Sequence, residues 1–98
     1  MERVEIEGLA ESFLDFCVIA YNNLSVDGGM RGLEKTIILY RKNASERLNS
    51  NSQEVLDIIQ ERTYRYLSQP GIYTILPDDR KRILESVFKD ERISKLSL

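Results

Sequence analysis

Residues 50–67 constrain the fold more than any other part of the chain, because both the start and the end of a helix can be located there. Ser50 and Gln53 can form a capping box, in which two side chains bind amide groups that the first turn leaves unpaired. Asn51 and Glu54 are an equivalent pair one residue later. A Gln-Pro-Gly sequence soon after this stretch ends the helix, since proline and glycine disfavour its continuation.

The same stretch is amphipathic. When successive residues are placed about 100° apart, its apolar side chains gather on one face and most polar side chains take the other. The first face contains Val55, Leu56, Ile59, Thr63, Tyr66 and Leu67. A helix of this kind buries its apolar face against other helices, so the pattern predicts an all-α fold.

The whole chain predicts a small antiparallel four-helix bundle. The expected helices cover about residues 2–24, 30–49, 52–68 and 78–89. Residues 72–76 are apolar but too few for a helix, so we expect a short extended segment across the end of the bundle. Residues 90–98 are expected to be a loosely docked tail, because Ile93 and Leu96 fall opposite the buried face of the last helix.

The length and the amino-acid composition of the chain limit the class of protein. A chain of 98 residues allows one helical domain, and 42% hydrophobic with 31% charged residues is typical of a globular protein. No apolar run approaches the roughly 18 residues of a membrane-spanning helix, and the acidic start lacks the pattern of a signal peptide. The single cysteine, Cys17, agrees with a reducing compartment. We therefore expect a cytoplasmic protein.

Four apolar residues depart from the helical pattern and lie on the polar side of their predicted helices. They are Val18 and Ile19 in the first helix, and Ile38 and Leu39 in the second. Together with Tyr64 they could form a contiguous apolar patch, which would indicate a protein interface. A self-complementary patch of this kind most often produces a homodimer.

The same residues also fit two different arrangements. Both helices could be buried more completely than a four-helix bundle requires, which would place these side chains in the core. Alternatively, residues 16–21 or 36–40 could form a strand, since both segments are rich in aromatic and β-branched residues.

Charge is distributed unevenly along the chain. Residues 1–29 contain six acids and one base, a net charge of −5, whereas residues 30–49 contain five bases and two acids, a net charge of +3. The simplest arrangement is that an acidic first helix lies beside a basic second helix in the same molecule. Exposed pairs contribute only about 0–1 kcal/mol each, so they orient the helices more than they stabilise them.

The sequence offers few groups for chemistry. It contains no histidine and one cysteine, so neither a Cys/His zinc site nor a nucleophile–histidine pair can form. Cys17 lies on the apolar face of its predicted helix, which favours a core position. We expect no catalytic, cofactor-binding or metal-binding residues.

Nucleic-acid binding is also not expected. The run Arg80-Lys81-Arg82 is the densest group of bases, but consecutive residues of a helix point in three directions. The net charge of the chain is −2, whereas a nucleic-acid-binding surface requires a basic patch.

The second half of the chain resembles one known family in its layout. A helix over Glu54–Leu67, a loop, and a last helix that starts at Leu76-Pro77 are similar to the four-helix bundles of bacteriocin immunity proteins. The resemblance implies protection of the producing cell by engagement of a toxin–receptor complex at the inner membrane face. Residues Asp90–Leu98 would then be the candidate specificity element, and peripheral contact with the membrane is expected only under this alternative.

The functional prediction is therefore a small non-enzymatic helical protein that acts through protein–protein interaction. Its expected partner is a second copy of itself or another protein, and the candidate contact residues are those of the apolar patch. The immunity-like function is the alternative, and a small enzyme that uses arginine and carboxylate groups is a third possibility. A concave pocket that gathers Glu61, Arg62 and Arg65 would favour the enzyme.

Overall fold

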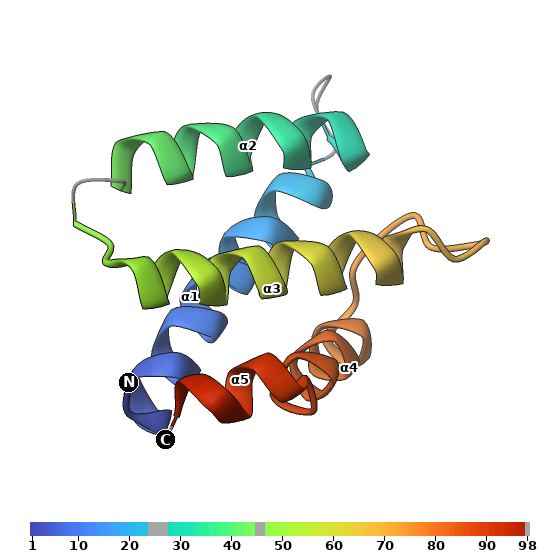
Figure 1. The fold of residues 1–98 in the computed structure, drawn as a ribbon. Coiled ribbons are helices and arrows are strands. Elements are labelled where there is room, and N and C mark those ends of the chain that lie inside the picture. Colours follow the sequence, from blue (N-terminus) through green and yellow to red (C-terminus); the bar gives the residue numbers. More distant parts are fainter. Residues whose placement is uncertain (24–27, 45–46, 98) are drawn as a thin grey trace.

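The chain is all-helical over the residues that the computed structural model describes, which are 1–23, 28–44 and 47–97. These residues form five helices and no strand (Figure 1). The helices are α1 (Arg3–Tyr21), α2 (Gly29–Ala44), α3 (Ser50–Leu67), α4 (Pro77–Phe88) and α5 (Glu91–Leu96). The predicted fold class is confirmed: four main helices pack together, and the fifth is short. None of the described helices is both long and apolar enough to cross a membrane.

The bundle is organised around α1 and α3. In Figure 1, α1 passes behind α3 and ends next to α2, while α4 and α5 lie on the side of α3 opposite α2. Helix α1 packs against α2, α3 and α4, and α3 packs against α1, α4 and α5. In the described part of the chain, no Cα atoms of α2 and α3 approach within 8 Å, so α2 is attached to the bundle mainly through α1.

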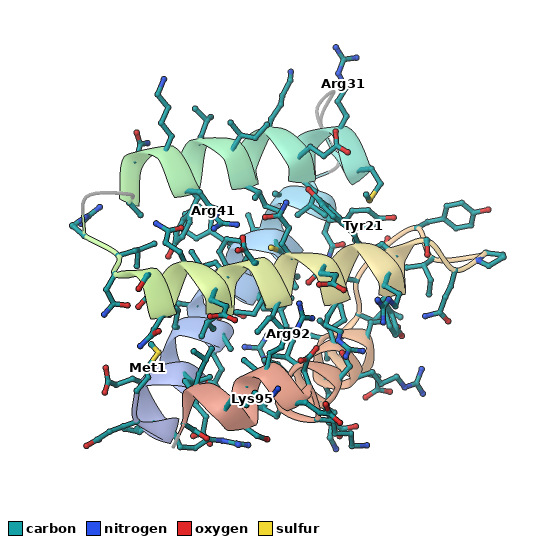
Figure 2. All side chains as sticks on the ribbon, viewed as in Figure 1. Met1, Tyr21, Arg31, Arg41, Arg92 and Lys95 are labelled. Carbon is teal, nitrogen blue, oxygen red and sulfur yellow. The ribbon has the colours of Figure 1, made fainter. Side chains whose placement is uncertain are left out.

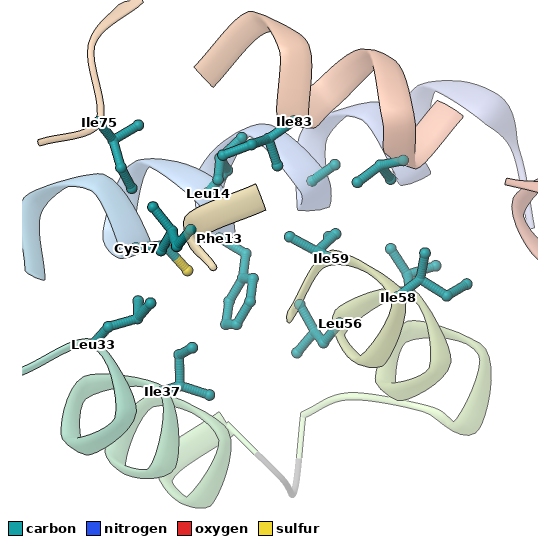
Figure 3. Close-up of a cluster of buried hydrophobic side chains, with 14 of the residues drawn as sticks. Phe13, Leu14, Cys17, Leu33, Ile37, Leu56, Ile58, Ile59, Ile75 and Ile83 are labelled. Carbon is teal, nitrogen blue, oxygen red and sulfur yellow. The ribbon is translucent and has the colours of Figure 1, made fainter. Parts of the chain in front are cut away.

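The core lies where α1 and α3 cross, and every helix contributes to it (Figure 3). Its largest members are fully buried aliphatic and aromatic side chains. They include Ile6, Phe13, Leu14, Leu33, Leu56, Ile58, Ile59, Ile83 and Ile93. The apolar face predicted for residues 50–67 is thus the inner face of α3, and burial of each such side chain favours folding by about 1.5–3 kcal/mol.

The N-cap of helix α3 lies one residue before the first predicted capping box and two residues before the second. Asn49 is the N-cap, and its side-chain oxygen accepts a hydrogen bond of 2.8 Å from the backbone N–H of Ser52. Asparagine is among the best N-cap residues, so it competes successfully with the serine that follows it. At the other end the chain turns at Gly71, whose φ of +86° is a conformation that favours glycine.

Residues 72–76 are not helical and bend at Thr74, and the predicted extended conformation is seen at Leu76. Ile75 is buried, and the Asn22 side chain both donates to its carbonyl oxygen at 2.8 Å and accepts from its backbone N–H at 2.7 Å. The Tyr21 hydroxyl donates to the carbonyl oxygen of Ile72 at 3.0 Å. The end of α1 therefore holds this segment by three hydrogen bonds.

Two predicted helix ends differ from the structure. Helix α1 ends at Tyr21, because Asn22 turns its side chain to residues 72–76 instead of continuing the helix. Helix α2 ends at Ala44 rather than near Asn49, which is used as the cap of α3. Residues 24–27 and 45–46, which include predicted helical positions, lie outside the described residues.

The expected loose tail is instead an ordered helix. Asp90 caps α5 by accepting a hydrogen bond of 2.9 Å from the backbone N–H of Arg92, and Ile93 is fully buried. The chain turns at Asp90, so Ile93 points into the core although a continuous α4 would direct it outward. Residue 98 lies outside the described residues.

Candidate functional site

An apolar groove lies between α2 and α1. It has a volume of about 590 Å³. Its walls are formed by one residue of α1 and by residues along α2 and just beyond it. These are Phe16, Thr36, Leu39, Tyr40, Asn43, Ala44, Arg47 and Leu48.

Two aromatic rings, Phe16 and Tyr40, line the groove, and a third, Phe13, packs against Tyr40 outside the lining. Tyr40 packs against Phe13 with ring centroids 5.2 Å apart, and against Phe16 with centroids 5.1 Å apart. Phe13 is buried, whereas Phe16 is 49% exposed. Helices α1 and α2 diverge from their connection (Figure 1), so the rings fill the angle between them only in part. The groove is the part of the space between α1 and α2 that these rings leave open.

Large apolar side chains are exposed to solvent in this groove and next to it. Ile19 is 73% exposed and lies one helical turn from Phe16, and Leu39 is 59% exposed on the opposite wall. We call the surface formed by Phe16, Ile19 and Leu39 the α1–α2 face. Single exposed apolar residues are ordinary, but Phe16 and Leu39 line the same groove, and Ile19 extends their apolar surface along α1.

The five predicted interface residues separate into three groups. Ile19 and Leu39 belong to the α1–α2 face. Ile38 is 65% exposed, but it lies one residue further round α2, outside the lining of the groove. Val18 is half-buried against the core, and Tyr64 is half-buried on α3.

The structure also decides between the arrangements that these residues allowed. The strand alternative is wrong, because residues 16–21 belong to α1 and residues 36–40 to α2. A core position is wrong for Ile19, Ile38 and Leu39, all of which are mostly exposed.

Tyr64 lies in a second, polar cleft of about 360 Å³ between α2 and α3. Burial raises the pKa of its hydroxyl above the ordinary value, with a smaller contribution from the Glu34 carboxylate. Arg41 spans this cleft: its guanidinium donates to Asp57 and, at 2.9 Å, to the side chain of Gln53. Arg41 is two residues from Leu39, so the polar cleft and the groove occupy opposite sides of α2.

The arginines that an enzyme could use are engaged in ion pairs. Arg62 donates to the buried Asp90 at 2.8 Å, and Arg65 donates to Glu61 at 3.2 Å. Arg92 binds both acids, at 2.8 Å to Asp90 and 3.0 Å to Glu61. Hydrogen bonds from Arg92 and Arg62 hold the pKa of the Asp90 carboxyl well below its usual range, although burial opposes this shift. The network fastens α5 to α3.

Cys17 occupies the core, as its position on the apolar face indicates. Burial raises the pKa of its thiol to about 12, so the thiolate is scarce at neutral pH. Among the described residues, no group of three His, Cys, Asp or Glu side chains is placed to hold a metal ion.

Sequence reasoning missed Phe16 and Tyr40 as surface residues. Phe16 is exposed and Tyr40 is half-buried, although the helical period places both beside core residues of their helices. Their exposure depends on the angle at which α1 and α2 diverge, and periodicity within a single helix contains no information about that angle. Comparison of the chain with protein-family models, curated proteins and solved structures gave no match.

Proposed function

We propose that this protein acts by binding another protein chain through the α1–α2 face, without chemistry of its own. The observation that carries the proposal is the exposure of Phe16 and Leu39 in one apolar groove, with Ile19 exposed one helical turn from Phe16. Leaving these side chains in water costs free energy that a partner would recover at about 25 cal/mol for each Å² of apolar surface covered.

The character of the groove supports a protein partner. Its lining is mainly apolar, with aromatic rings at the floor and polar side chains at the rim, such as Asn43 and Arg47. Protein interfaces have this arrangement, with an apolar centre rich in aromatic residues and a polar margin. The partner is a second copy of this chain or another protein.

Site-directed photo-cross-linking in cells that express the chain tests this function. A photoreactive amino acid at position 39 should give covalent adducts of defined mass with a protein. The same amino acid at position 85, where Glu85 is exposed on α4, is the control and should give none. Equal cross-linking at both positions would show that the α1–α2 face has no special role.

A third cross-linking position addresses the immunity-like alternative, which we propose only in second place. That alternative implies contact through the C-terminal region, where Lys95 is exposed on α5 (Figure 2). Adducts at position 95 and none at position 39 would favour the immunity-like function.

A further inference from the structure

The geometry points to a second copy of this chain as the occupant of the α1–α2 face, with α1 of each copy lying over α2 of the other. This inference rests on the proposed function and specifies its partner. It is carried by charge: the face has an acidic margin on α1 and a basic margin along α2.

The acidic margin is a row of residues at four-residue spacing on α1. Glu7, Glu11 and Asp15 form this acidic row, and all three are exposed. Residues four apart form a continuous ridge on a helix, and the next residue of the same ridge is Ile19 of the α1–α2 face. Acidic and apolar parts of α1 therefore form one ridge.

Helix α2 and the turn that follows it contain the matching row. Arg31, Lys35 and Arg47 form this basic row, and all three are exposed. Arg31, Lys35 and Leu39 lie on one four-residue ridge of α2, and Arg47, beyond the end of the helix, lines the groove together with Leu39. Figure 2 shows the Arg31 side chain directed away from the bundle on α2.

Several charges of the two helices are directed to other parts of the molecule. Asp15 pairs with Arg80 of α4 at 2.8 Å, and Glu7 pairs with Arg3 of α1 itself at 3.3 Å. On α2, Arg41 binds Asp57 of α3 across the polar cleft. None of these three pairs joins α1 to α2, and the side chains of both rows are exposed at the surface.

A two-fold axis along the line that bisects α1 and α2 would make this match between molecules. Rotation about that axis places the acidic row of one copy on the basic row of the other, twice, with the α1–α2 faces in contact at the centre. A two-fold axis perpendicular to this line would place like charges together. Self-complementary surfaces related by a two-fold axis are the usual basis of homodimers, and charge complementarity fixes their orientation.

Sedimentation equilibrium of the full chain over a concentration series tests the inference. The wild-type chain should form a dimer of twice 11.4 kDa, and Leu39→Asp should be monomeric. Reversal of the basic row in Lys35→Glu/Arg47→Glu should weaken the dimer roughly tenfold or more, as should reversal of the acidic row in Glu7→Lys/Glu11→Lys. The control Glu54→Lys/Glu85→Lys reverses two exposed acids elsewhere and should leave the dimer unchanged.

Mixing the two reversed variants gives the decisive result. One variant then has two acidic margins and the other two basic margins, so a mixed dimer should form although neither variant dimerises well alone. A dimer that is insensitive to both reversals, or two variants that fail to associate when mixed, would overturn the proposed axis. Far-ultraviolet circular dichroism of each variant confirms that the helices are intact.

The failure of this inference is distinguishable from failure of the proposed function. A wild-type chain that stays monomeric at all concentrations overturns the second copy as the occupant. The cross-link from position 39 to a different protein would still support binding through the α1–α2 face. The absence of any adduct at position 39 would remove both.

Discussion

At the scale of single residues, Thr63 shows an unsatisfied polar group inside an apolar core. Its side chain is fully buried, and its hydroxyl has no hydrogen-bond partner among the described residues. Burial of an unpaired hydroxyl costs about 1–3 kcal/mol, and valine has the same shape without this group. Thr63 follows the core residue Ile59 by one helical turn, so its position serves packing rather than hydrogen bonding.

We therefore expect Thr63→Val to raise the free energy of unfolding by roughly 1 kcal/mol. Urea unfolding followed by circular dichroism measures this change. The control is Thr74→Val, at an exposed threonine outside the helices, which should alter stability by less than about 0.5 kcal/mol. A large loss of stability in Thr63→Val would mean that the hydroxyl makes a bond that stabilises the core.

The carboxylate of Asp90 holds the last helix, α5, against α3 through ion pairs with two arginines. Its carboxyl has a lowered pKa in the folded chain because Arg92 and Arg62 bind the charged form. A lowered folded-state pKa means that the charged carboxylate stabilises the fold. This stabilisation is complete above the unfolded pKa of about 3.9 and is lost as the pH falls below it toward the folded value.

Asp90→Asn should therefore lower the free energy of unfolding at pH 7 by about 1–3 kcal/mol, since two arginines lose their anionic partner. The difference between wild type and variant should shrink as the pH falls from about 4 toward about 2. Urea unfolding at several pH values measures the loss of stability at pH 7 and its change with pH. A difference that is constant from neutral to acidic pH would show that the Asp90 charge does not stabilise the fold.

At the scale of elements, the junction between α1 and residues 72–76 depends on one amide side chain. Asn22 binds both backbone groups of Ile75, which lie at a partly buried position. Removal of this side chain leaves the N–H and the carbonyl of Ile75 without that partner, while the Tyr21 bond to Ile72 remains.

Asn22→Ala should cost about 1–3 kcal/mol of stability and increase hydrogen exchange at the Ile75 amide. Two-dimensional NMR exchange measurements locate the effect, and urea unfolding gives its size. Asn43→Ala, on the exposed side of α2, is the matched control and should leave the Ile75 amide protected. Equal protection in both variants would show that the Asn22 side chain does not hold this segment.

Helices were predictable from sequence, whereas their ends and the last turn of the chain were less so. The apolar period of residues 50–67 and the proline at the start of α4 gave two helices almost in full. The cap at Asn49 was missed because several capping residues stand in a row. Helix α5 was missed because its position depends on the pairing of Asp90 with Arg62, which is 28 residues away in the chain.

At the scale of the whole molecule, the surface was predictable only in part. Helical periodicity alone identified Ile19, Ile38 and Leu39 as apolar residues on polar faces, and the structure exposes all three. It could not identify the groove beside Phe16, because the groove depends on the angle between two helices. It also grouped Tyr64 with these residues, although α2 separates the polar cleft from the groove.

Ile38 and Leu39 are large apolar residues on the exposed side of α2. Ile38→Asp with Leu39→Asp should keep the helical content and lower the free energy of unfolding by less than about 1 kcal/mol, the cost of aspartate within a helix. Leu33→Asp is the contrasting control on the same helix: Leu33 is fully buried, so an unpaired charge there should cost several kcal/mol or unfold the chain. Circular dichroism and urea unfolding of the three proteins make the comparison. If the double variant unfolded as readily as Leu33→Asp, residues 38 and 39 would be core, and a binding surface on this side of α2 would be untenable. If it stays folded, these two large apolar side chains contribute little to the stability of the monomer, so a role for them must be sought in contact with another chain.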